Sequence, residues 1–250
     1  MGALQSRIAI VTGAAQGIGE SIALEFAAEG ARIAVADINF EGAKRVAALA
    51  ESRGSVAMAV EVDVTQETSI VAMVKIVVAK YGSVDVLVNN AGAYPRFVWH
   101  EMTVEQWDHI QALNLRSCFL CSREVFPYLK SKMAGKIINL SSVTFLVGRP
   151  HNLVHYIASK GGVIGFTRAL AHDVGEFNIQ VNAITPGAVE SEEERKVATP
   201  EMTAAIVALQ SLRNRVQVRD IARTAVFLAS ADSDLITGQT INVDAGWAMH

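Results

Sequence analysis

A tyrosine and a lysine four residues apart, Tyr156 and Lys160, are the side chains in this sequence best suited to moving a proton. Residues at this spacing lie on one face of a helix. The pair alone is weak support for a site, because tyrosine and lysine often occur this way on protein surfaces. Three groups of polar residues strengthen it, at the ends of apolar runs or inside a helical stretch: Ser141–Ser142, Asn89–Gly92 and Asn114.

A glycine-rich turn with the sequence TGAAQGIG spans Thr12–Gly19, directly after the first apolar run. Its glycines, Gly13, Gly17 and Gly19, let the backbone turn tightly and approach a pyrophosphate closely. The helical segment that follows offers free N–H groups and the positive end of a helix dipole. A glycine turn placed between a strand and a helix therefore predicts a dinucleotide site.

The second apolar run ends at Asp37, twenty residues after Gly17 (37 − 17 = 20). A carboxylate at this place accepts hydrogen bonds from the adenosine ribose hydroxyls and repels a 2′-phosphate. The nearby residues Gln16, Ile38 and Asn39 supply no positive charge. The pattern predicts NAD rather than NADP. The alternative is that Asp37 only caps the next helix.

These residues need a scaffold, and the sequence alternates short β-branched runs with longer segments of helical spacing. The expected strands are Arg7–Val11, Arg32–Asp37, Val56–Val62, Val84–Asn89, Gly135–Leu140, Gln180–Ile184 and Thr240–Val243. The expected helices are Ile18–Glu29, Glu41–Arg53, Glu67–Lys80, Val104–Lys130, Val154–Gly175 and Val218–Ser230. Such alternation predicts βαβ units and a parallel sheet covered on both faces. No linker or repeat interrupts it, so residues 1–250 are expected to form a single α/β domain.

Composition narrows the functional class. The chain has 250 residues, 51% of them hydrophobic, and a formal net charge of −3 with no basic patch, which argues against a nucleic-acid partner. Met1–Ser6 is too short and polar for a signal peptide, and no apolar run reaches the ~18 residues of a membrane span. We therefore expect a cytoplasmic protein that does not contact a membrane. Cys118 and Cys121 have C-x-x-C spacing but lie mid-helix, which favours packing over redox or metal chemistry.

Together the motifs resemble the short-chain dehydrogenase/reductase family over essentially the whole chain. Besides the glycine turn, the matching residues are Asp63–Val64, Asn89–Gly92, Asn114, Ser142, Tyr156–Lys160, Pro186–Gly187 and Ile236–Gly246. The resemblance implies a single Rossmann-type domain with a seven-stranded parallel sheet, and a homotetramer. Several stretches look closest to a subgroup that contains 1-phenylethanol dehydrogenase and pyridoxal 4-dehydrogenase.

The resemblance also implies roles for individual residues. Tyr156 exchanges a proton with the substrate oxygen, and Lys160, together with oxidised nicotinamide, lowers the pKa of the tyrosine. Ser142 orients the substrate oxygen, and Asn114 binds a water that links Lys160 to solvent. The positions expected to contact the cofactor are Gly13, Gln16, Gly17, Ile18, Gly19, Asp37, Ile38, Asp63, Val64, Asn90, Ala91, Gly92, Tyr156, Lys160, Pro186, Gly187, Val189 and Ser191.

Two departures from the family pattern affect the site. Ser142 precedes Tyr156 by fourteen positions (156 − 142 = 14), one more than is usual, which predicts one extra residue in the loop Arg149–His155. Ser141 is the weaker candidate for the catalytic serine. Ser191 stands where threonine is more usual and keeps the hydroxyl.

The expected substrate residues are mostly apolar or aromatic: Tyr94, Val143, Phe145, His151 and Leu153. Residues 188–217, with an acidic cluster around Glu192–Glu194 and an amphipathic stretch Ala204–Leu212, are interpreted as a mobile substrate lid. Such a pocket favours a secondary, cyclic or aromatic alcohol or its carbonyl form. His151 and His155 have i,i+4 spacing but no evident third ligand, so no metal is expected.

Two alternatives remain open. One is a carbonyl reductase acting on 3-oxoacyl thioesters, whose carrier-bound form would need a basic docking patch. The other, from a different class, is a nucleotide-sensing module without turnover, which only the altered spacing from serine to tyrosine favours.

Overall fold

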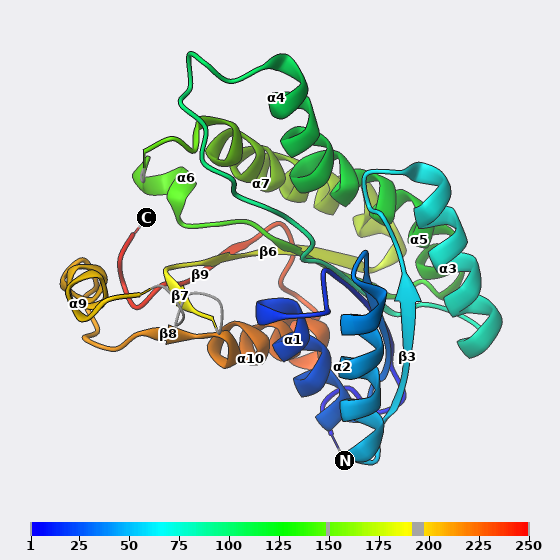
Figure 1. Ribbon diagram of the computed structural model, residues 1–250. Helices are drawn as coiled ribbons and strands as arrows, with labels where there is room; N and C mark the ends of the chain where they lie inside the picture. The colour runs from blue at the N-terminus through cyan, green and yellow to red at the C-terminus, as the bar shows by residue number, and fades with distance from the viewer. Residues whose placement is uncertain (1, 149–150, 192–197, 250) are drawn as a thin grey trace.

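Seven parallel strands form one sheet in the order β3-β2-β1-β4-β5-β6-β9 (Figure 1). The structure, a computed structural model, describes residues 2–148, 151–191 and 198–249. The strands of this sheet are β1 (Ile8–Thr12), β2 (Arg32–Asp37), β3 (Val56–Glu61), β4 (Val86–Asn89), β5 (Gly135–Leu140), β6 (Ile179–Pro186) and β9 (Thr240–Val243). The predicted α/β class and seven-stranded parallel sheet are confirmed.

Helices cover both faces of the sheet, as predicted (Figure 1). One core holds buried residues of α1 (Gly17–Ala28), α2 (Phe40–Ser52) and α10 (Val218–Ala229), among them Phe26. The other holds buried residues of α3 (Glu67–Tyr81), α5 (Ser117–Lys132) and α7 (Val154–Val174), among them Met73. Because both faces are covered, central strands such as β1 and β4 are buried along their whole length and show no alternation of buried and exposed residues.

The strand order reverses between β1 and β4, which are neighbours in the sheet. Ligands of open α/β sheets bind at the carboxyl ends of the strands beside such a reversal. β1 ends at Thr12 and β4 ends at Asn89, so the glycine turn and the Asn89–Gly92 motif start side by side. The topology thus brings together motifs about eighty residues apart in sequence (90 − 12 = 78).

The predicted uninterrupted α-helix Val104–Lys130 was wrong in its interior. The chain forms α4 (Val104–Gln111), then a π-helical turn (Ala112–Arg116), then α5, which ends at Lys132. Asn114 lies in the π turn with its side chain bonded to another segment. A π turn widens the helix locally and re-aims a side chain, and such turns are frequent at functional sites. The poor helix propensity of asparagine was the only sequence signal for it.

Most other bounds differ from the expected ones by one or two residues, as is usual at the ends of elements. The largest change in a strand is at β6, which continues to Pro186 because Pro186 still pairs with Val243 of β9. A proline at the end of a strand removes no ladder bond that the sheet needs.

The described residues of the segment expected to be a lid, 188–191 and 198–217, contain three short elements. β7 (Val189–Glu190) and β8 (Val216–Gln217) pair in parallel, and α9 spans Pro200–Ala208. The amphipathic stretch Ala204–Leu212 only partly coincides with this helix, which begins at Pro200 and ends at Ala208. The Thr199 hydroxyl accepts a hydrogen bond from the backbone N–H of Met202, and this cap with proline at the first position starts the helix earlier. Glu192–Glu194 lie outside the described residues.

No helix among the described residues is long and apolar enough to cross a membrane.

Candidate active site

Ser142, Tyr156 and Lys160 come together at the carboxyl end of β5. Ser142 follows β5 after one residue, and Tyr156 and Lys160 lie in the first two turns of α7. The Ser142 side chain lies close enough to the Tyr156 hydroxyl to lower the pKa of that phenol. The Nζ atom of Lys160 lies 5.9 Å from the centroid of the Tyr156 ring and donates to the Leu140 carbonyl at 2.6 Å. The three residues selected from sequence spacing therefore form one cluster.

The two adjacent serines have different partners. Ser141 Oγ donates to the backbone carbonyl of Lys160 at 2.7 Å, which fastens β5 to α7. Ser142 Oγ accepts from Thr144 twice, from the backbone N–H at 3.2 Å and from the hydroxyl at 2.9 Å. Ser142 therefore keeps its own hydrogen to donate toward Tyr156. The sequence did not single out Thr144, because its contact arises from α6 (Thr144–Val147), a short helix that begins the longer loop.

Burial controls the ionisation of this cluster. Burial raises the pKa of Tyr156, and the nearby Ser142 side chain lowers it by less. Burial also lowers the pKa of Lys160, whose charged form loses hydration inside the protein. The expectation that Lys160, together with oxidised nicotinamide, lowers the pKa of Tyr156 concerns the cofactor-bound protein and remains a prediction.

Asn114 connects the π turn to the segment after β4 and to α7. Its side chain accepts from the Ala93 N–H and donates to the Ala93 carbonyl, each at 3.0 Å. It also donates to Ser159 Oγ at 3.1 Å. A Cβ atom on Gly92 would lie 3.0 Å from Asn114 Oδ1 and 3.5 Å from Lys160 Nζ. The glycine therefore lets the segment after β4 pass close to the lysine, while the expected water-binding role of Asn114 remains a prediction.

The glycine turn forms a cradle that side chains would fill. Gly13 has φ +63°, and a Cβ on Gly19 would lie 2.2 Å from the Gly13 carbonyl oxygen. Asn90 Nδ2 donates to the carbonyls of Thr12 and Gly13, both at 2.9 Å, and so fixes the turn to the end of β4. Helix α1 begins at Gly17, and the Gln16 side chain makes no capping bond to its N–H groups. Such a cradle fits the pyrophosphate of a dinucleotide.

Asp37 is held at the rim of this cradle. Its carboxylate accepts from the Ala15 N–H at 2.9 Å and from the Asn39 N–H at 2.8 Å. The residue that caps α2 is Asn39, whose side chain accepts from the Gly42 N–H. The alternative in which Asp37 is a plain helix cap is therefore wrong.

Arg45 is a charged neighbour of the turn that sequence reasoning missed. Its guanidinium bonds to the Ala15 carbonyl at 3.0 Å and to the Glu20 carboxylate at 2.6 Å. Arg45 belongs to α2 and Glu20 to α1, so only the packing of the two helices brings them together. The pairing with Glu20 offsets the positive charge of Arg45 beside the turn.

The remaining expected cofactor residues follow the carboxyl ends of other strands. Asp63 follows β3, and its carboxylate accepts from the N–H and hydroxyl of Thr65 at 2.9 and 2.7 Å. Gly187 follows β6, and a Cβ there would lie 2.7 Å from the Cα of Asp244. The other expected positions on this edge are Ile18, Ile38, Val64, Ala91, Pro186, Val189 and Ser191.

The expected substrate residues differ in accessibility. Tyr94 is 68% exposed, and its ring centroid lies 5.8 Å from that of Tyr156. Phe145 of α6 is half-buried and His151 is exposed. Val143 and Leu153 are only 1% and 3% exposed, so their side chains are largely enclosed by other parts of the chain.

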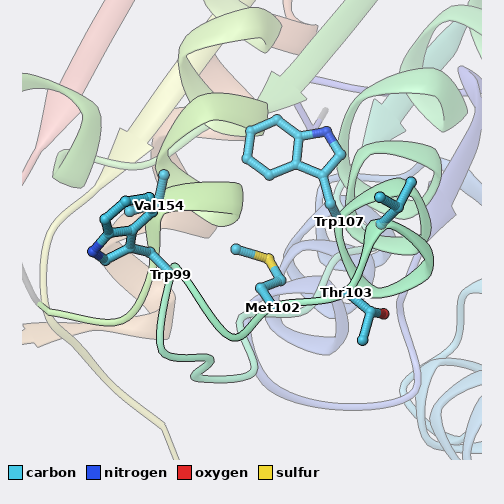
Figure 2. A pocket seen from close by; sticks show the side chains of 6 residues that line it. Trp99, Met102, Thr103, Trp107 and Val154 are labelled. Carbon is cyan, nitrogen blue, oxygen red and sulfur yellow. The ribbon is translucent and has the colours of Figure 1, made fainter.

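An apolar pocket of about 210 Å³ lies beside α4, lined by Trp99, Met102, Thr103, Val104, Trp107 and Val154. Figure 2 shows Met102 between the two tryptophan rings. None of the lining residues is one of the expected catalytic ones, so we do not assign the chemistry to this pocket.

The described residues contain no group of three or more His, Cys, Asp or Glu side chains placed to hold a metal ion. Cys118 and Cys121 are free and buried in α5, and burial raises the pKa of both thiols. A thiol with a raised pKa is a poor nucleophile near neutral pH.

Comparisons with known proteins identify the class. A family model described as enoyl-(acyl carrier protein) reductase matches residues 13–248. The chain is 39% identical over 248 residues to the 3-oxoacyl-(acyl-carrier-protein) reductase FabG of Staphylococcus aureus (strain Mu50 / ATCC 700699), covering 98% of this chain and 99% of that protein. It is 37% identical over 246 residues to the D-xylose 1-dehydrogenase of Caulobacter vibrioides (strain NA1000 / CB15N), covering 98% and 96%.

The chain therefore belongs to the short-chain dehydrogenase/reductase family. Members of this family are oxidoreductases that use a nicotinamide cofactor and act on small-molecule substrates.

Proposed function

We propose that this protein is an NAD-dependent oxidoreductase that transfers a hydride between nicotinamide and a secondary, cyclic or aromatic alcohol or its carbonyl form. The observation that carries the proposal is the cluster of Ser142, Tyr156 and Lys160 beside a glycine cradle with Asp37 at its rim. The nicotinamide supplies hydride acceptance in one direction and hydride donation in the other.

The chain's own residues handle the proton and the geometry. In alcohol oxidation, the Tyr156 phenolate takes the proton of the substrate hydroxyl, and in reduction the phenol returns it. Ser142, which accepts both bonds from Thr144, donates its own hydrogen to the substrate oxygen and orients it. Lys160 holds the nicotinamide ribose and provides a positive charge near the phenol ring. Asn114 holds the segment after β4 against this cluster.

The proposed preference for NAD rests on Asp37. A carboxylate fixed by two backbone N–H groups suits the ribose hydroxyls and repels a 2′-phosphate. We expect NADH to bind at least about a hundredfold more tightly than NADPH, since two like charges at close range cost several kcal/mol. Titration of both cofactors with the native chain and with Asp37→Asn tests this. Asp37→Asn should reduce the difference between the affinities for NADH and NADPH. Equal affinities for the two cofactors in the native chain would refute the argument.

The proposed substrate class rests on the aromatic surroundings of Tyr156. The centroid of the exposed Tyr94 ring lies 5.8 Å from that of Tyr156, and this aromatic surface suits a ring-bearing alcohol better than a sugar. We propose residues 188–217 as the lid over this substrate. A screen of cyclic and aromatic secondary alcohols, following NADH absorbance, identifies the substrate. Turnover of sugars alone would contradict the aromatic assignment.

A second candidate is reduction of 3-oxoacyl thioesters, which the similarity to FabG favours. The same cluster would then work in the reducing direction on an acyl chain. Comparing 3-oxobutyryl thioester reduction with the oxidation of 1-phenylethanol separates the two candidates, since each predicts the higher kcat/KM for its own substrate.

A nucleotide-sensing module without turnover is the weakest candidate. The longer spacing between Ser142 and Tyr156 favoured it, yet Ser142 still lies close enough to Tyr156 to lower the pKa of the phenol. NADH binding without turnover of any screened substrate would support it.

We further propose that the chain is a cytoplasmic homotetramer whose subunits meet through α5 and α7. Phe119 of α5 is 46% exposed, which is consistent with a surface that a second copy covers. Sedimentation analysis tests the assembly, and a monomer would contradict it.

A further inference from the structure

Two segments, one beside Tyr156 and one that contains it, are joined by several contacts. One is Tyr94–Phe97, after β4, and the other is His151–Tyr156, which leads into α7. We call this set of contacts the clasp. It comprises two ring contacts and three hydrogen bonds. The ring centroids of Tyr94 and Tyr156 are 5.8 Å apart, and those of Phe97 and His155 are 5.2 Å apart. The hydrogen bonds join His155 Nε2 to the Pro95 carbonyl at 3.0 Å, the Arg96 guanidinium to the His151 carbonyl at 2.8 Å, and the Phe97 N–H to the Asn152 carbonyl at 3.1 Å.

His155 is the centre of the clasp and the only one of its side chains here that is fully enclosed, at 0% exposed. The Pro95 carbonyl can only accept, so Nε2 of His155 carries the hydrogen and donates. The backbone carbonyl of His155 accepts from Gln111 at the end of α4. A single residue thus joins α7, α4 and the segment after β4.

The other ring nitrogen of His155, Nδ1, is buried and has no hydrogen-bond partner among the described residues. A buried polar atom left unpaired is unfavourable, and most core positions avoid it. An apolar side chain would fill the same space without that penalty, but it would lose the donor to Pro95. The bond to Pro95 is therefore the feature of this residue that an apolar side chain cannot replace.

The position of the clasp links His155 to substrate contact. Tyr94 immediately precedes Pro95, and its exposed ring tilts at 59° to the ring of Tyr156. A shift of Pro95 would carry Tyr94 with it and change the space above the Tyr156 hydroxyl. Displacements of about 1 Å in a positioning contact are enough to change the kinetics strongly.

We propose that His155 is a positioning residue that sets Tyr94–Phe97 as one wall of the substrate pocket, so that an aromatic ring of the substrate packs against Tyr94. This inference rests on the proposed oxidation of aromatic alcohols. It assigns His155 no contact with substrate or cofactor. His151 and Asn152, which lie in the loop expected to hold the extra residue, both take part in the clasp.

The test compares two variants of His155 in the full-length chain. His155→Leu removes the donor at similar volume, and His155→Gln keeps an N–H donor on a side chain of comparable reach. His172→Leu, at an exposed position of the same helix, is the matched control. The measurements are kcat and KM for 1-phenylethanol with NAD, NADH affinity by titration, and hydrogen exchange of the amides in residues 94–97.

We expect His155→Leu to raise the KM for 1-phenylethanol about tenfold, the equivalent of a lost hydrogen bond and its packing. NADH affinity should stay within about twofold, and residues 94–97 should exchange faster. His155→Gln should restore both KM and exchange, and His172→Leu should behave like the native chain.

The proposal is overturned if His155→Leu keeps the native KM and exchange. It is also overturned if kcat and NADH affinity both fall while KM rises and His155→Gln restores none of the three, because that pattern marks a general structural role. If the native chain does not oxidise 1-phenylethanol, the proposed substrate class fails for that compound. The exchange measurement then tests by itself whether His155 holds residues 94–97 in place. Faster exchange in His155→Leu, with a return to the native rate in His155→Gln, supports this role, and unchanged exchange in His155→Leu refutes it.

Discussion

The hydroxyl groups of Ser141 and Ser142 lie one residue apart yet have different partners. Ser141 donates to the Lys160 carbonyl and so joins α7 to the sheet. Ser142 lies close to Tyr156 and accepts a hydrogen bond from the Thr144 hydroxyl. Ser142→Ala should lower kcat/KM by about a hundredfold or more, since it removes a donor to the reacting oxygen, while the loss of the bonds from Thr144 should lower the melting temperature by only about 2–4 °C. Steady-state kinetics and thermal unfolding of the variant measure both quantities.

Ser141→Ala should lose stability but keep its activity. It loses one buried hydrogen bond, which costs about 1 kcal/mol of unfolding free energy and a melting temperature lower by about 2–4 °C. Its kcat/KM should stay near the native value. If Ser141→Ala lost activity and Ser142→Ala kept it, the assignment of the serine would be reversed.

Burial of Tyr156 predicts the pH dependence of the two reaction directions. Because burial raises the pKa of the phenol above its ordinary value of about 10, the protonated form dominates at neutral pH. Alcohol oxidation needs the phenolate, so its kcat/KM should rise with pH in the alkaline range. Carbonyl reduction needs the phenol, so its kcat/KM should fall as the phenol ionises.

Profiles of kcat/KM against pH in both directions check this. The positive charge of oxidised nicotinamide favours the phenolate, so the rise for oxidation should begin at lower pH than the fall for reduction. Oxidation that became slower as the pH rose above neutral would contradict a tyrosine base.

At the scale of elements, the contact between α1 and the glycine turn is as close as glycine permits. A Cβ on Gly19 would lie 2.2 Å from the Gly13 carbonyl and 2.5 Å from Asn90 Nδ2. Gly19→Ala must therefore push α1 away from the turn, at a cost of about 1–3 kcal/mol in unfolding free energy. The same displacement should weaken NADH binding by about tenfold. Thermal unfolding and NADH titration measure both effects.

Gly175→Ala is the matched control, because Gly175 has φ −59° at the end of α7 with no atom within 4 Å of an added Cβ. This change should leave NADH affinity unchanged and stabilise the fold by about 0.4–1 kcal/mol through the unfolded chain. If Gly19→Ala bound NADH as tightly as the native chain does, the proposal that the glycine turn binds the cofactor would be contradicted.

The elements that sequence patterns predicted well are those whose signal is local. β2, β5 and β9 have the expected bounds, because each is rich in Ile, Val, Leu or Ala and is short enough to be recognised from its own residues. The break in the long helix was not predicted, because the π turn depends on the bonds from Asn114 to Ala93, a residue on a distant segment. The start of α9 was not predicted either, although Thr199 and Pro200 carry a local cap signal just before the amphipathic stretch.

At the scale of the whole molecule, the parallel sheet explains why a few scattered motifs could predict most of the site. Thr12, Asn89 and Leu140 end neighbouring strands, so the residues after them must meet at one edge. The sequence could not reveal contacts made between helices or loops, such as Arg45 with Glu20 or His155 with Pro95. Those contacts depend on how the helices pack over the sheet, and no spacing along the chain encodes them.

The most direct test of the account is the turnover of Tyr156→Phe compared with its binding of NADH. Removing the hydroxyl takes away the proton carrier but leaves the ring, Lys160 and the glycine cradle in place. The account predicts that oxidation of the screened alcohol falls by at least about a hundredfold while NADH affinity stays within about twofold of the native value. Undiminished turnover in this variant would contradict the assignment of Tyr156 as the acid and base.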